Sequence, residues 1–460
     1  MNQLLSFVLI IAVASTVPLF DPSEARFALI VKLSKEHESY FQPMFYNNSN
    51  ELVYYYSKPP MYVWFAMIFN SFMPIELAQR FPSLLAGFIY LFLLPILFGL
   101  NKTRILTFVT CYPAFIIAMI LGITDTLFSF FLICSLIFFF HLNKPILAGF
   151  FCGLSVLTKG PVGLVLIVAS ILLAKFFGFP NKGLLSVIFT SILTSSWWFI
   201  YSSIRDKGFV DYYFVQENLN RFLGKGVLEY GTLHKEPYGL AAIGSLLFFV
   251  PYVKAFFETS KTLFAKKNNL SEAEKIRLAA LIFILVVITF YSFSRTFLFS
   301  YLLPIAFALP IVLSDKDLQP TNTLLNFVSF VFIVTSSLYC AIFANNWLIL
   351  LTPAIATVKY VFYRRDNVVF LFTTLAIYNI IAVSRSNYDL KKIPSIDCSI
   401  VKHIHSRYHS AEIYLPMQVI RTTPGNIASG DCVLLEKDEV DNTKFQEIFR
   451  GRNLVIAKAI

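Results

Sequence analysis

Long apolar runs recur along most of the chain and predict its main elements. Runs that are long enough, or nearly so, to cross about 30 Å of hydrocarbon lie at roughly 81–98, 105–120, 126–141, 146–158, 161–178, 184–201, 239–257, 278–293, 299–313, 324–343, 347–363 and 367–384. A further run, MNQLLSFVLIIAVAS, begins the chain; it lacks the basic residues of a cleavable signal, and we interpret it as a retained helix. The pattern predicts an all-α polytopic membrane protein with about thirteen transmembrane helices over residues 1–384.

Two shorter segments have the periodicity of helices with one apolar face. Between Pro22 and Lys35, apolar residues fall at Phe27, Ile30 and Val31, and the segment from Met61 to Met73 is similar in character. Helices of this kind lie in the plane of a membrane surface. We therefore predict two interfacial helices shortly after the first apolar run.

The tail, residues 385–460, changes character and predicts a small α/β module outside the membrane. The stretches HSAEIYLPM, GDCVLLEKD and NLVIAKAI are typical of short strands, whereas Ile396–Tyr408 and Thr443–Phe449 are typical of helices. His403, His405 and His409 are poorly spaced for a helical metal site, which favours solvated histidines. In an oxidising compartment Cys398 and Cys432 could form a disulfide.

Composition and charge support a membrane protein and narrow its class. Hydrophobic residues make up 57% of the chain and charged residues only 14%, which excludes a typical soluble globule. The net charge of +11 does not indicate nucleic-acid binding, because the Lys and Arg residues are dispersed through short loops. The loops that are rich in them predict a cytoplasmic N-terminus, and this topology places loops 20–60 and 202–238 and the tail on the outer side.

The same topology brings many ionisable residues to the outer face. Ionisable groups at a membrane are expensive, and a shared face indicates a shared cavity. The residues concerned are Asp21, Glu24, Arg26, Lys58, Asp125, Lys159, His234, Glu236 and Arg295. Cations above hydrocarbon suit a lipid-linked phosphate, and a nearby carboxylate could act as a general base or orient an acceptor.

Each part of this constellation has a simpler interpretation. The segment Pro18–Ser34 could be an ordinary interfacial loop, Asp125 could cap the helix that follows it, and Lys159 could extend to the membrane surface. The aromatic residues of the long loop Tyr201–Gly239 suit a sugar ring, but a membrane-interface belt has the same composition.

Eight stretches, in order over roughly residues 18–310, carry a resemblance to a known family. They are PLFDPSEARFA, YYSKPPMYVWF, RFPSLLAGF, TDTLFSFF, GLSVLTKGPVGLVL, YYFVQENLNRFL, HKEPYG and FSRTFLFSYLLP. The chain resembles the polyprenyl-phosphate-sugar-dependent glycosyltransferases of the GT-C type, in particular the lipid A aminoarabinose transferases and, more distantly, the protein O-mannosyltransferases. The resemblance implies inverting transfer of a sugar from undecaprenyl phosphate to an acceptor at the periplasmic face of a bacterial inner membrane.

The resemblance also implies roles for individual residues. Acidic residues of the family match Asp21, Glu24 and Asp125, and the lysine that holds the donor phosphate matches Lys58. The remaining cavity positions are expected to bind the phosphate (Arg26, Lys159, Arg295) or the substrate (His234, Glu236, Tyr301).

Two departures from the family matter. Ser23 stands where many members have the first acidic residue, so Asp21 or Glu24 replaces it or no base is used. Ser57 stands where many have a Glu, which makes a divalent metal doubtful.

The sequence leaves the sugar and the acceptor open. Lipid A is the acceptor that the resemblance favours, with a protein or another envelope glycan as alternatives. A transporter of the lipid-linked sugar and an assembly subunit are competing functions. The predicted partners are the polyprenyl-phosphate sugar, the acceptor and the bilayer.

Overall fold

The computed structural model describes residues 10–11, 14–15, 17–47, 50–98, 112–225, 236–249, 252–266, 269–315, 390, 398–403, 409–415, 417–422, 424–436, 439–441, 444–450 and 454–460. The predicted helices at 324–343, 347–363 and 367–384, and most of the N-terminal run, lie outside these residues.

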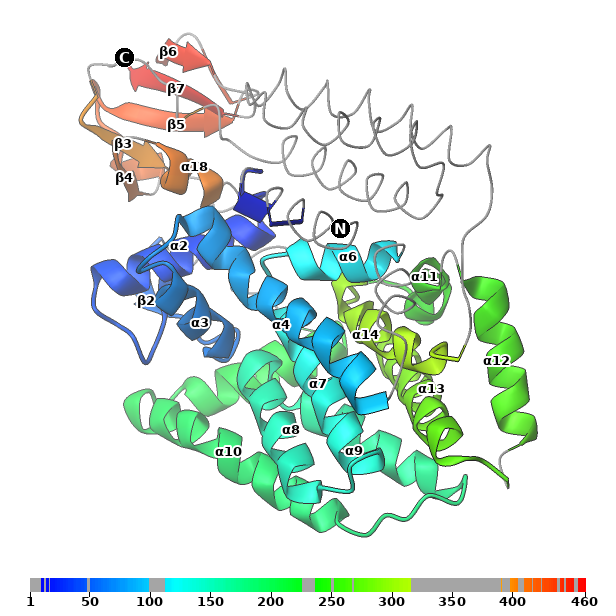
Figure 1. Ribbon diagram of the computed structural model, residues 1–460. Helices are drawn as coiled ribbons and strands as arrows, with labels where there is room; N and C mark the ends of the chain where they lie inside the picture. Colours follow the sequence, from blue (N-terminus) through cyan, green and yellow to red (C-terminus); the bar gives the residue numbers. More distant parts are fainter. Residues whose placement is uncertain are drawn as a thin grey trace, which may run out of the picture.

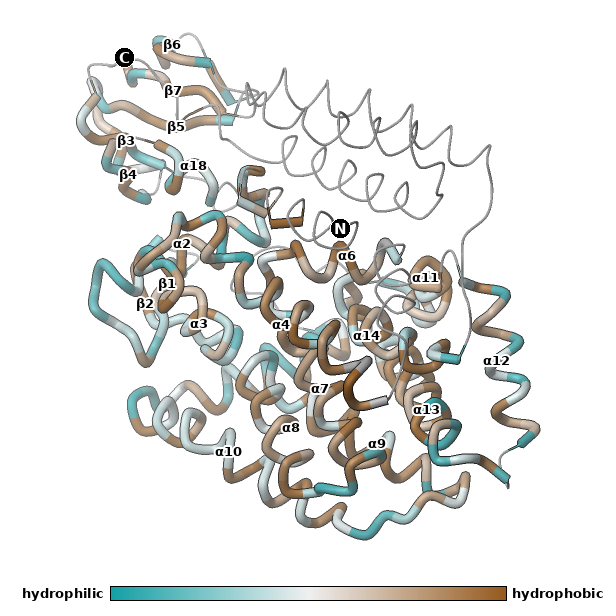
Figure 2. The backbone as a smooth tube through the Cα atoms, viewed as in Figure 1, coloured by the Kyte–Doolittle hydropathy of each residue, from teal (hydrophilic) through white to brown (hydrophobic). Residues whose placement is uncertain are grey.

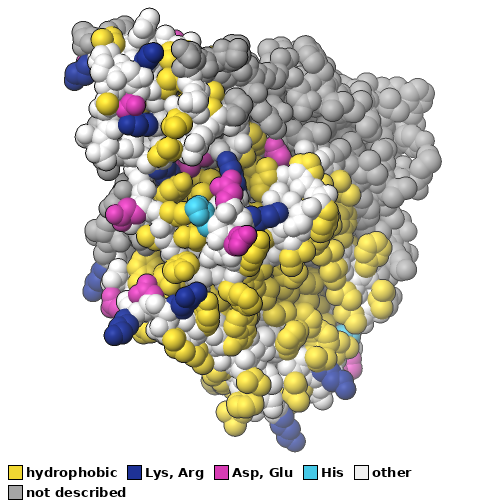
Figure 3. All heavy atoms as spheres, turned by 90° about the vertical axis from the view of Figure 1, so that its left-hand side faces the viewer, with side chains coloured by type: hydrophobic (Ala, Val, Ile, Leu, Met, Phe, Trp, Pro, Cys, Tyr) yellow, Lys and Arg dark blue, Asp and Glu magenta, His cyan; other side chains and the backbone are white. Residues whose placement is uncertain are grey.

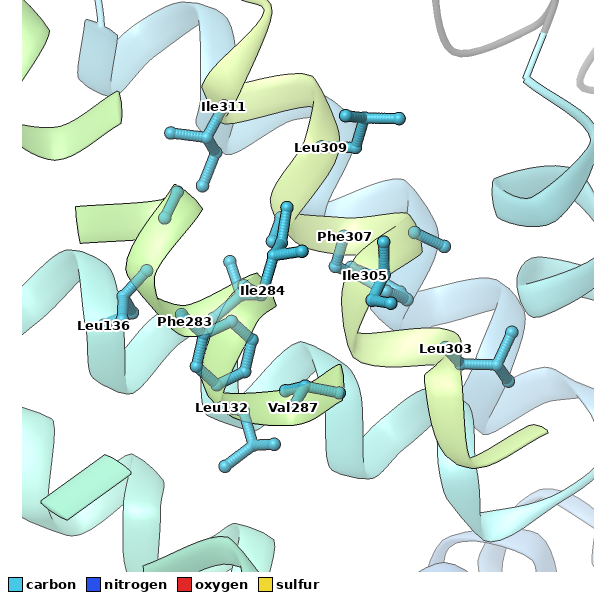
Figure 4. Close-up of a cluster of buried hydrophobic side chains, with 14 of the residues drawn as sticks. Leu132, Leu136, Phe283, Ile284, Val287, Leu303, Ile305, Phe307, Leu309 and Ile311 are labelled. Atoms are coloured by element: carbon cyan, nitrogen blue, oxygen red, sulfur yellow. The ribbon is translucent and has the colours of Figure 1, made fainter. Parts of the chain in front are cut away.

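A bundle of helices forms the body of the molecule, and α7 runs through its centre (Figure 1). Nearly every side chain of α7 is buried, which is expected of a helix that is apolar on all sides. Figure 4 shows Leu132 and Leu136 of α7 beside Phe283 of α13 and the buried residues of α14. The elements of the bundle are α4 (Ile75–Phe98), α6 (Pro113–Ile120), α7 (Thr124–Phe140), α8 (Pro145–Lys159), α9 (Val162–Lys175), α10 (Leu184–Arg205), η1 (Asp211–Asn220), α11 (Leu240–Phe248), α12 (Val253–Ala265), α13 (Glu272–Ser292), η2 (Phe299–Leu302) and α14 (Leu303–Val312).

Hydrophobic residues predominate along many helices of the bundle (Figure 2), and the face drawn in Figure 3 carries large areas of hydrophobic side chains. On α10, Leu185 is 80% exposed and Ile204 is 79% exposed, and further apolar side chains of the helix are exposed between them. Apolar surface of this extent is typical of a helix in contact with lipid.

By length and composition, α10 alone among the described helices could cross a membrane unaided. Two bent pairs, α6 with α7 (115°) and α11 with α12 (107°), raise the number to three if each pair counts as one span. The prediction of one continuous helix over 239–257 was wrong. That run contains Pro251, which cannot donate a helical hydrogen bond.

Helices α8 and α10 approach each other closely at two glycines. A Cβ on Gly149 would lie 2.7 Å from the carbonyl oxygen of Val187, and a Cβ on Gly153 would lie 2.8 Å from that of Ser191. Small residues four apart allow such close backbone packing in membrane helices. This contact fixes α8, whose last residue is Lys159.

The segment between the first apolar run and α4 folds as a small layer beside the bundle. It consists of α2 (Ser23–Glu36), β1 (Met44–Tyr46), β2 (Leu52–Tyr54) and α3 (Met61–Phe69), which confirms both predicted helices. The surroundings of α2 differ from the prediction, because almost its whole length is buried under the β1–β2 hairpin, α3 and the C-terminal module.

The C-terminal module contains a five-stranded sheet in the order β4-β3-β5-β7-β6. Strand β3 pairs in parallel with β4 and β5, and β7 is antiparallel to β5 and β6. Its elements are β3 (Ile400–His403), α18 (His409–Tyr414), β4 (Gln418–Arg421), η5 (Pro424–Asn426), β5 (Cys432–Glu436), β6 (Phe445–Arg450) and β7 (Leu454–Ala459).

Several predictions for the module were wrong, and others were confirmed. The predicted strand over 409–417 begins as α18, while the predicted helices contain β3 and β6, because sheet partners distant in sequence outweigh local propensity. Cys398 and Cys432 are joined in a disulfide. His403 and His409 are buried rather than solvated, and His405 lies outside the described residues.

Candidate functional site

A pocket of about 90 Å³ opens where the ends of several elements meet on one side of the bundle. Its charged lining comes from α2, from the segment before α3, from the start of α7, from the end of α8 and from η1. The lining residues are Ser23, Arg26, Phe27, Tyr55, Ser57, Lys58, Ile123, Thr124, Asp125, Lys159, Glu217, Arg221, Leu298, Ser300 and Tyr301. The structure therefore brings together five residues that the sequence selected: Arg26, Lys58, Asp125, Lys159 and Tyr301.

Asp125 and Lys159 form a buried ion pair in the lining of the pocket. The Lys159 ammonium donates to the Asp125 carboxylate and lies 3.9 Å from the centre of the Tyr301 ring. Asp125 does not cap α7, whose N-cap is Ile123, and Lys159 is only 7% exposed. Asp125 is therefore not a helix cap, and Lys159 does not extend to the membrane surface. The two side chains pair with each other and line the pocket.

Lys58, Glu217 and Arg221 form a second charged group in the lining of the same pocket. Oε1 of Glu217 accepts from Nη1 of Arg221 at 2.9 Å and lies 3.5 Å from Nζ of Lys58. Arg221 also donates from Nη2 to the Tyr301 hydroxyl at 3.2 Å, which links this group to Lys159. Removal from water lowers the pKa of Lys58 to about 8, against the opposing attraction of Glu217.

Arg26 extends the positive lining on the side of α2. Its Nε is buried and has no hydrogen-bond partner among the described residues. A buried guanidinium that is not fully satisfied is expected to bind an anion that enters the pocket. Ser23, one turn earlier in α2, also lines the pocket.

An adjoining groove of about 330 Å³ shares Lys58, Lys159, Glu217, Arg221 and Tyr301 with this pocket. The remainder of its lining is mostly apolar and includes Val162, Val165, Phe214, Leu219, Phe222 and Phe290. Several of these side chains are partly exposed, so the groove is open to the surroundings of the bundle. A charged pocket that continues into an apolar groove suits an amphiphile with an anionic head group.

The structure does not bring Asp21 and Glu24 to the pocket. Glu24 is fully buried against Arg80 of α4, with Oε2 2.5 Å from Nη2, and its Oε1 accepts from the backbone N–H of Gly122 at 2.7 Å. Asp21 accepts from the backbone N–H of Ser410 at 2.9 Å and from the Ser410 hydroxyl. Both carboxylates therefore hold parts of the fold together.

The other selected residues lie outside the pocket lining or outside the described residues. Arg295 lies over the ring of Tyr238 at 4.7 Å and its carbonyl accepts from the N–H of Glu236 at 2.8 Å. Neither Arg295 nor Glu236 lines the pocket or the adjoining groove. His234 lies outside the described residues.

Glu217 and Arg221 belong to the long loop Tyr201–Gly239, whose composition suits a sugar, but the sequence did not assign either to the site; both line the pocket. The available signal was an acidic and a basic residue four apart among the aromatic residues of a long outer loop. The pattern did not reveal that this part of the loop is η1, a π-helix. Such helices are rare and are often found at functional sites.

No protein-family model matches the chain. It is 25% identical over 328 residues to an undecaprenyl phosphate-alpha-4-amino-4-deoxy-L-arabinose arabinosyl transferase from Wigglesworthia glossinidia brevipalpis. The match covers 66% of this chain and 55% of that protein, so it spans about half the length of the relative.

The crystal structure of ArnT from Cupriavidus metallidurans bound to undecaprenyl phosphate matches 99% of this chain and 97% of its own, with a TM-score of 0.71 and 15% sequence identity. The chain has the ArnT fold. The apo state of that ArnT gives the same TM-score, with 14% identity. The sequence match to the arabinosyl transferase, together with this shared fold, confirms the resemblance to aminoarabinose transferases that the sequence motifs indicated.

Proposed function

We propose that this chain is a membrane glycosyltransferase that takes a sugar from a polyprenyl phosphate donor. The observation that carries the proposal is the continuity between a pocket with four cationic side chains and an apolar groove. The similarity to an arabinosyl transferase and to an ArnT with bound undecaprenyl phosphate supports it. By analogy, the chain acts in a bacterial inner membrane with this pocket on the periplasmic side.

In the proposed reaction, an acceptor oxygen attacks the anomeric carbon of the sugar from the face opposite the phosphate. The bond between the anomeric carbon and the phosphate oxygen breaks, and its electron pair leaves with the polyprenyl phosphate. The configuration of the sugar is inverted. Since negative charge develops on the leaving phosphate, cations that contact it supply the main stabilisation.

The residues of the pocket divide into two groups under this proposal. Arg26, Lys58 and Arg221 hold the phosphate, with the guanidinium groups able to bind two oxygens each. Asp125, held by Lys159 and next to Tyr301 in the lining, orients the sugar or the acceptor. The polyprenyl tail follows the apolar side of the groove.

The acceptor that best suits this pocket is already ionised, such as a phosphate group of lipid A. A serine or threonine hydroxyl needs a general base. Asp21 and Glu24 are engaged elsewhere, Ser23 occupies the position of the usual acidic residue, and Asp125 is paired with a lysine. A phosphate oxygen carries its charge near pH 7 and has no proton to lose. By analogy with the relative, the transferred group is an amino sugar.

A metal ion does not fit the donor atoms that line the pocket. No group of three His, Cys, Asp or Glu side chains that could hold a metal exists among the described residues. The pocket also has more cationic than anionic side chains, which disfavours a divalent cation.

The test is sugar transfer by the full chain reconstituted in nanodiscs with an undecaprenyl-phosphate-linked amino sugar and lipid A. Replacing Lys58 with Met is expected to reduce kcat/KM at least 100-fold, a loss of about 2.7 kcal/mol of transition-state stabilisation. Lys254→Met is the matched control, because that side chain is 91% exposed on α12. Movement of the donor across a bilayer without transfer would favour a transporter and contradict the proposal.

A further inference from the structure

Glu217 places a negative charge beside Lys58 and Arg221, two of the cations that are proposed to hold the phosphate. Its Oε1 is the acceptor for Arg221 at 2.9 Å and lies 3.5 Å from the Lys58 ammonium, so one oxygen serves both cations. The side chain is 6% exposed and lines both the pocket and the groove. A phosphate that reaches Lys58 and Arg221 therefore meets this carboxylate.

We infer that Glu217 is an exchangeable counter-ion that a phosphate oxygen replaces on Lys58 and Arg221, and that it promotes release of the polyprenyl phosphate product. The inference rests on the proposed function and concerns the same pocket. Glu217 acts through the two cations, so it is a positioning residue. Asp125 is different, because Lys159 is buried with it and also lies over Tyr301.

The charges of the pocket support this role. Its lining contains four cations, Arg26, Lys58, Lys159 and Arg221, and two carboxylates, Asp125 and Glu217, which leaves two formal positive charges in excess. The donor is a phosphodiester with one negative charge. The product is a phosphomonoester with a charge of about −1.5 to −2 at neutral pH. The excess therefore balances the product phosphate, which is the group whose charge develops during the reaction.

A pocket without Glu217 would carry a third excess positive charge. It would bind the product more tightly than the reaction requires, and product release would become slow. A fixed carboxylate next to the phosphate opposes this by repulsion, and the repulsion grows with the charge of the ligand. Glu217 is therefore expected to weaken binding of the monoester more than binding of a diester.

The alternative is that Glu217 only anchors Arg221. The two residues are four apart at the end of η1, and such a pair can be purely structural. Removing an anchor leaves Arg221 badly placed and weakens binding of every phosphate. The two roles thus predict changes of opposite sign.

The experiment measures equilibrium binding of undecaprenyl phosphate and of its methyl diester to the nanodisc-embedded full chain, together with kcat. For Glu217→Gln we expect about tenfold tighter binding of the monoester, about threefold tighter binding of the diester, and a lower kcat because product release is slower. Glu217→Asp keeps the charge and is expected to bind the monoester within about threefold of the unchanged protein.

Glu258→Gln is the matched control, because this glutamate is 62% exposed on α12 and lines neither the pocket nor the groove. Weaker binding of both ligands by Glu217→Gln would overturn the inference and leave the proposed function intact. An equal change for monoester and diester would also overturn it. Failure of the unchanged protein to bind undecaprenyl phosphate at all would instead overturn the proposed function.

Discussion

At the scale of single residues, the side chain of Lys58 shows how the pocket prepares a cation for an anionic ligand. It is 21% exposed and lies among Arg26, Lys159 and Arg221, with Glu217 as its ion-pair partner. Loss of water lowers the pKa of Lys58 to about 8, and the repulsion of the neighbouring cations adds to the effect. The negative charge of a bound phosphate raises the pKa of Lys58 again, so the lysine is fully protonated when the ligand is bound.

This pKa predicts the pH dependence of donor binding. Lys58 is cationic below pH 8 and neutral above it, whereas a phosphodiester keeps its single charge throughout. Affinity for the donor is therefore expected to be constant from pH 6 to 7.5 and to fall by about tenfold as the pH rises toward 9.5, since one charge contact is lost. Titration of the donor into the reconstituted chain at each pH measures this affinity.

The control for this prediction is Lys58→Arg. A guanidinium stays charged over the whole range, so the variant is expected to lose the fall in affinity above pH 8. A decline of equal size in the variant and the unchanged protein would assign the titration to another group.

At the scale of elements, α2 is fixed to the bundle by a buried charge pair. Every nitrogen of the Arg80 guanidinium donates, to Glu24 and to the carbonyl oxygens of Ala14, Val17 and Pro18. The same glutamate accepts from the N–H of Gly122, just before α7. Glu24 therefore joins the start of α2 to α4 and to the segment just before α7.

Replacement of Glu24 by Gln is expected to destabilise the protein by about 3–5 kcal/mol, because Arg80 would remain buried without its counter-ion. Thermal unfolding in detergent measures the loss. The folded protein should still bind undecaprenyl phosphate with nearly unchanged affinity, since Glu24 does not line the pocket. Glu36→Gln, at the exposed end of the same helix, is the control and should unfold at the same temperature as the unchanged protein. A stable variant without transfer activity would instead make Glu24 catalytic.

At the scale of the whole molecule, the C-terminal module is docked on α2 rather than attached only through the chain. The Tyr414 hydroxyl accepts from the N–H of Leu19 at 2.8 Å, and Ser410 donates to Asp21. Within the contact Glu412 pairs with Arg421 at 2.5 Å, and burial holds the pKa of His409 well below its usual value. The module therefore covers the back of the helix whose other side lines the pocket.

The disulfide between Cys398 and Cys432 is expected to stabilise this module by about 4 kcal/mol, because it closes a loop of 34 residues. Replacing both cysteines with alanine should make residues 398–460 more sensitive to limited proteolysis, while the helical bundle remains resistant. Ser399→Ala changes an exposed neighbour of the bond and is the control. Equal proteolysis rates with and without the disulfide would contradict the prediction.

The sequence by itself determined the helical class and the positions of α7 to α10 and α13. It also selected Arg26, Lys58, Asp125 and Lys159, but only as members of a larger set of outer charged residues. These features depend on local properties, because a run of apolar residues of sufficient length forms a helix. The eight family motifs also came from local stretches of sequence, and the structural match to ArnT agrees with them.

Only the tertiary structure decided which of the outer charges face the pocket. Glu24 pairs with a residue 56 positions away, Asp21 with one 389 positions away, and Lys58 with one 159 positions away. The strands of the module likewise depend on distant partners. A carboxylate in the sequence has the same chemistry in each case, but its role depends on which cation or N–H the fold places beside it, and no local pattern contains that information.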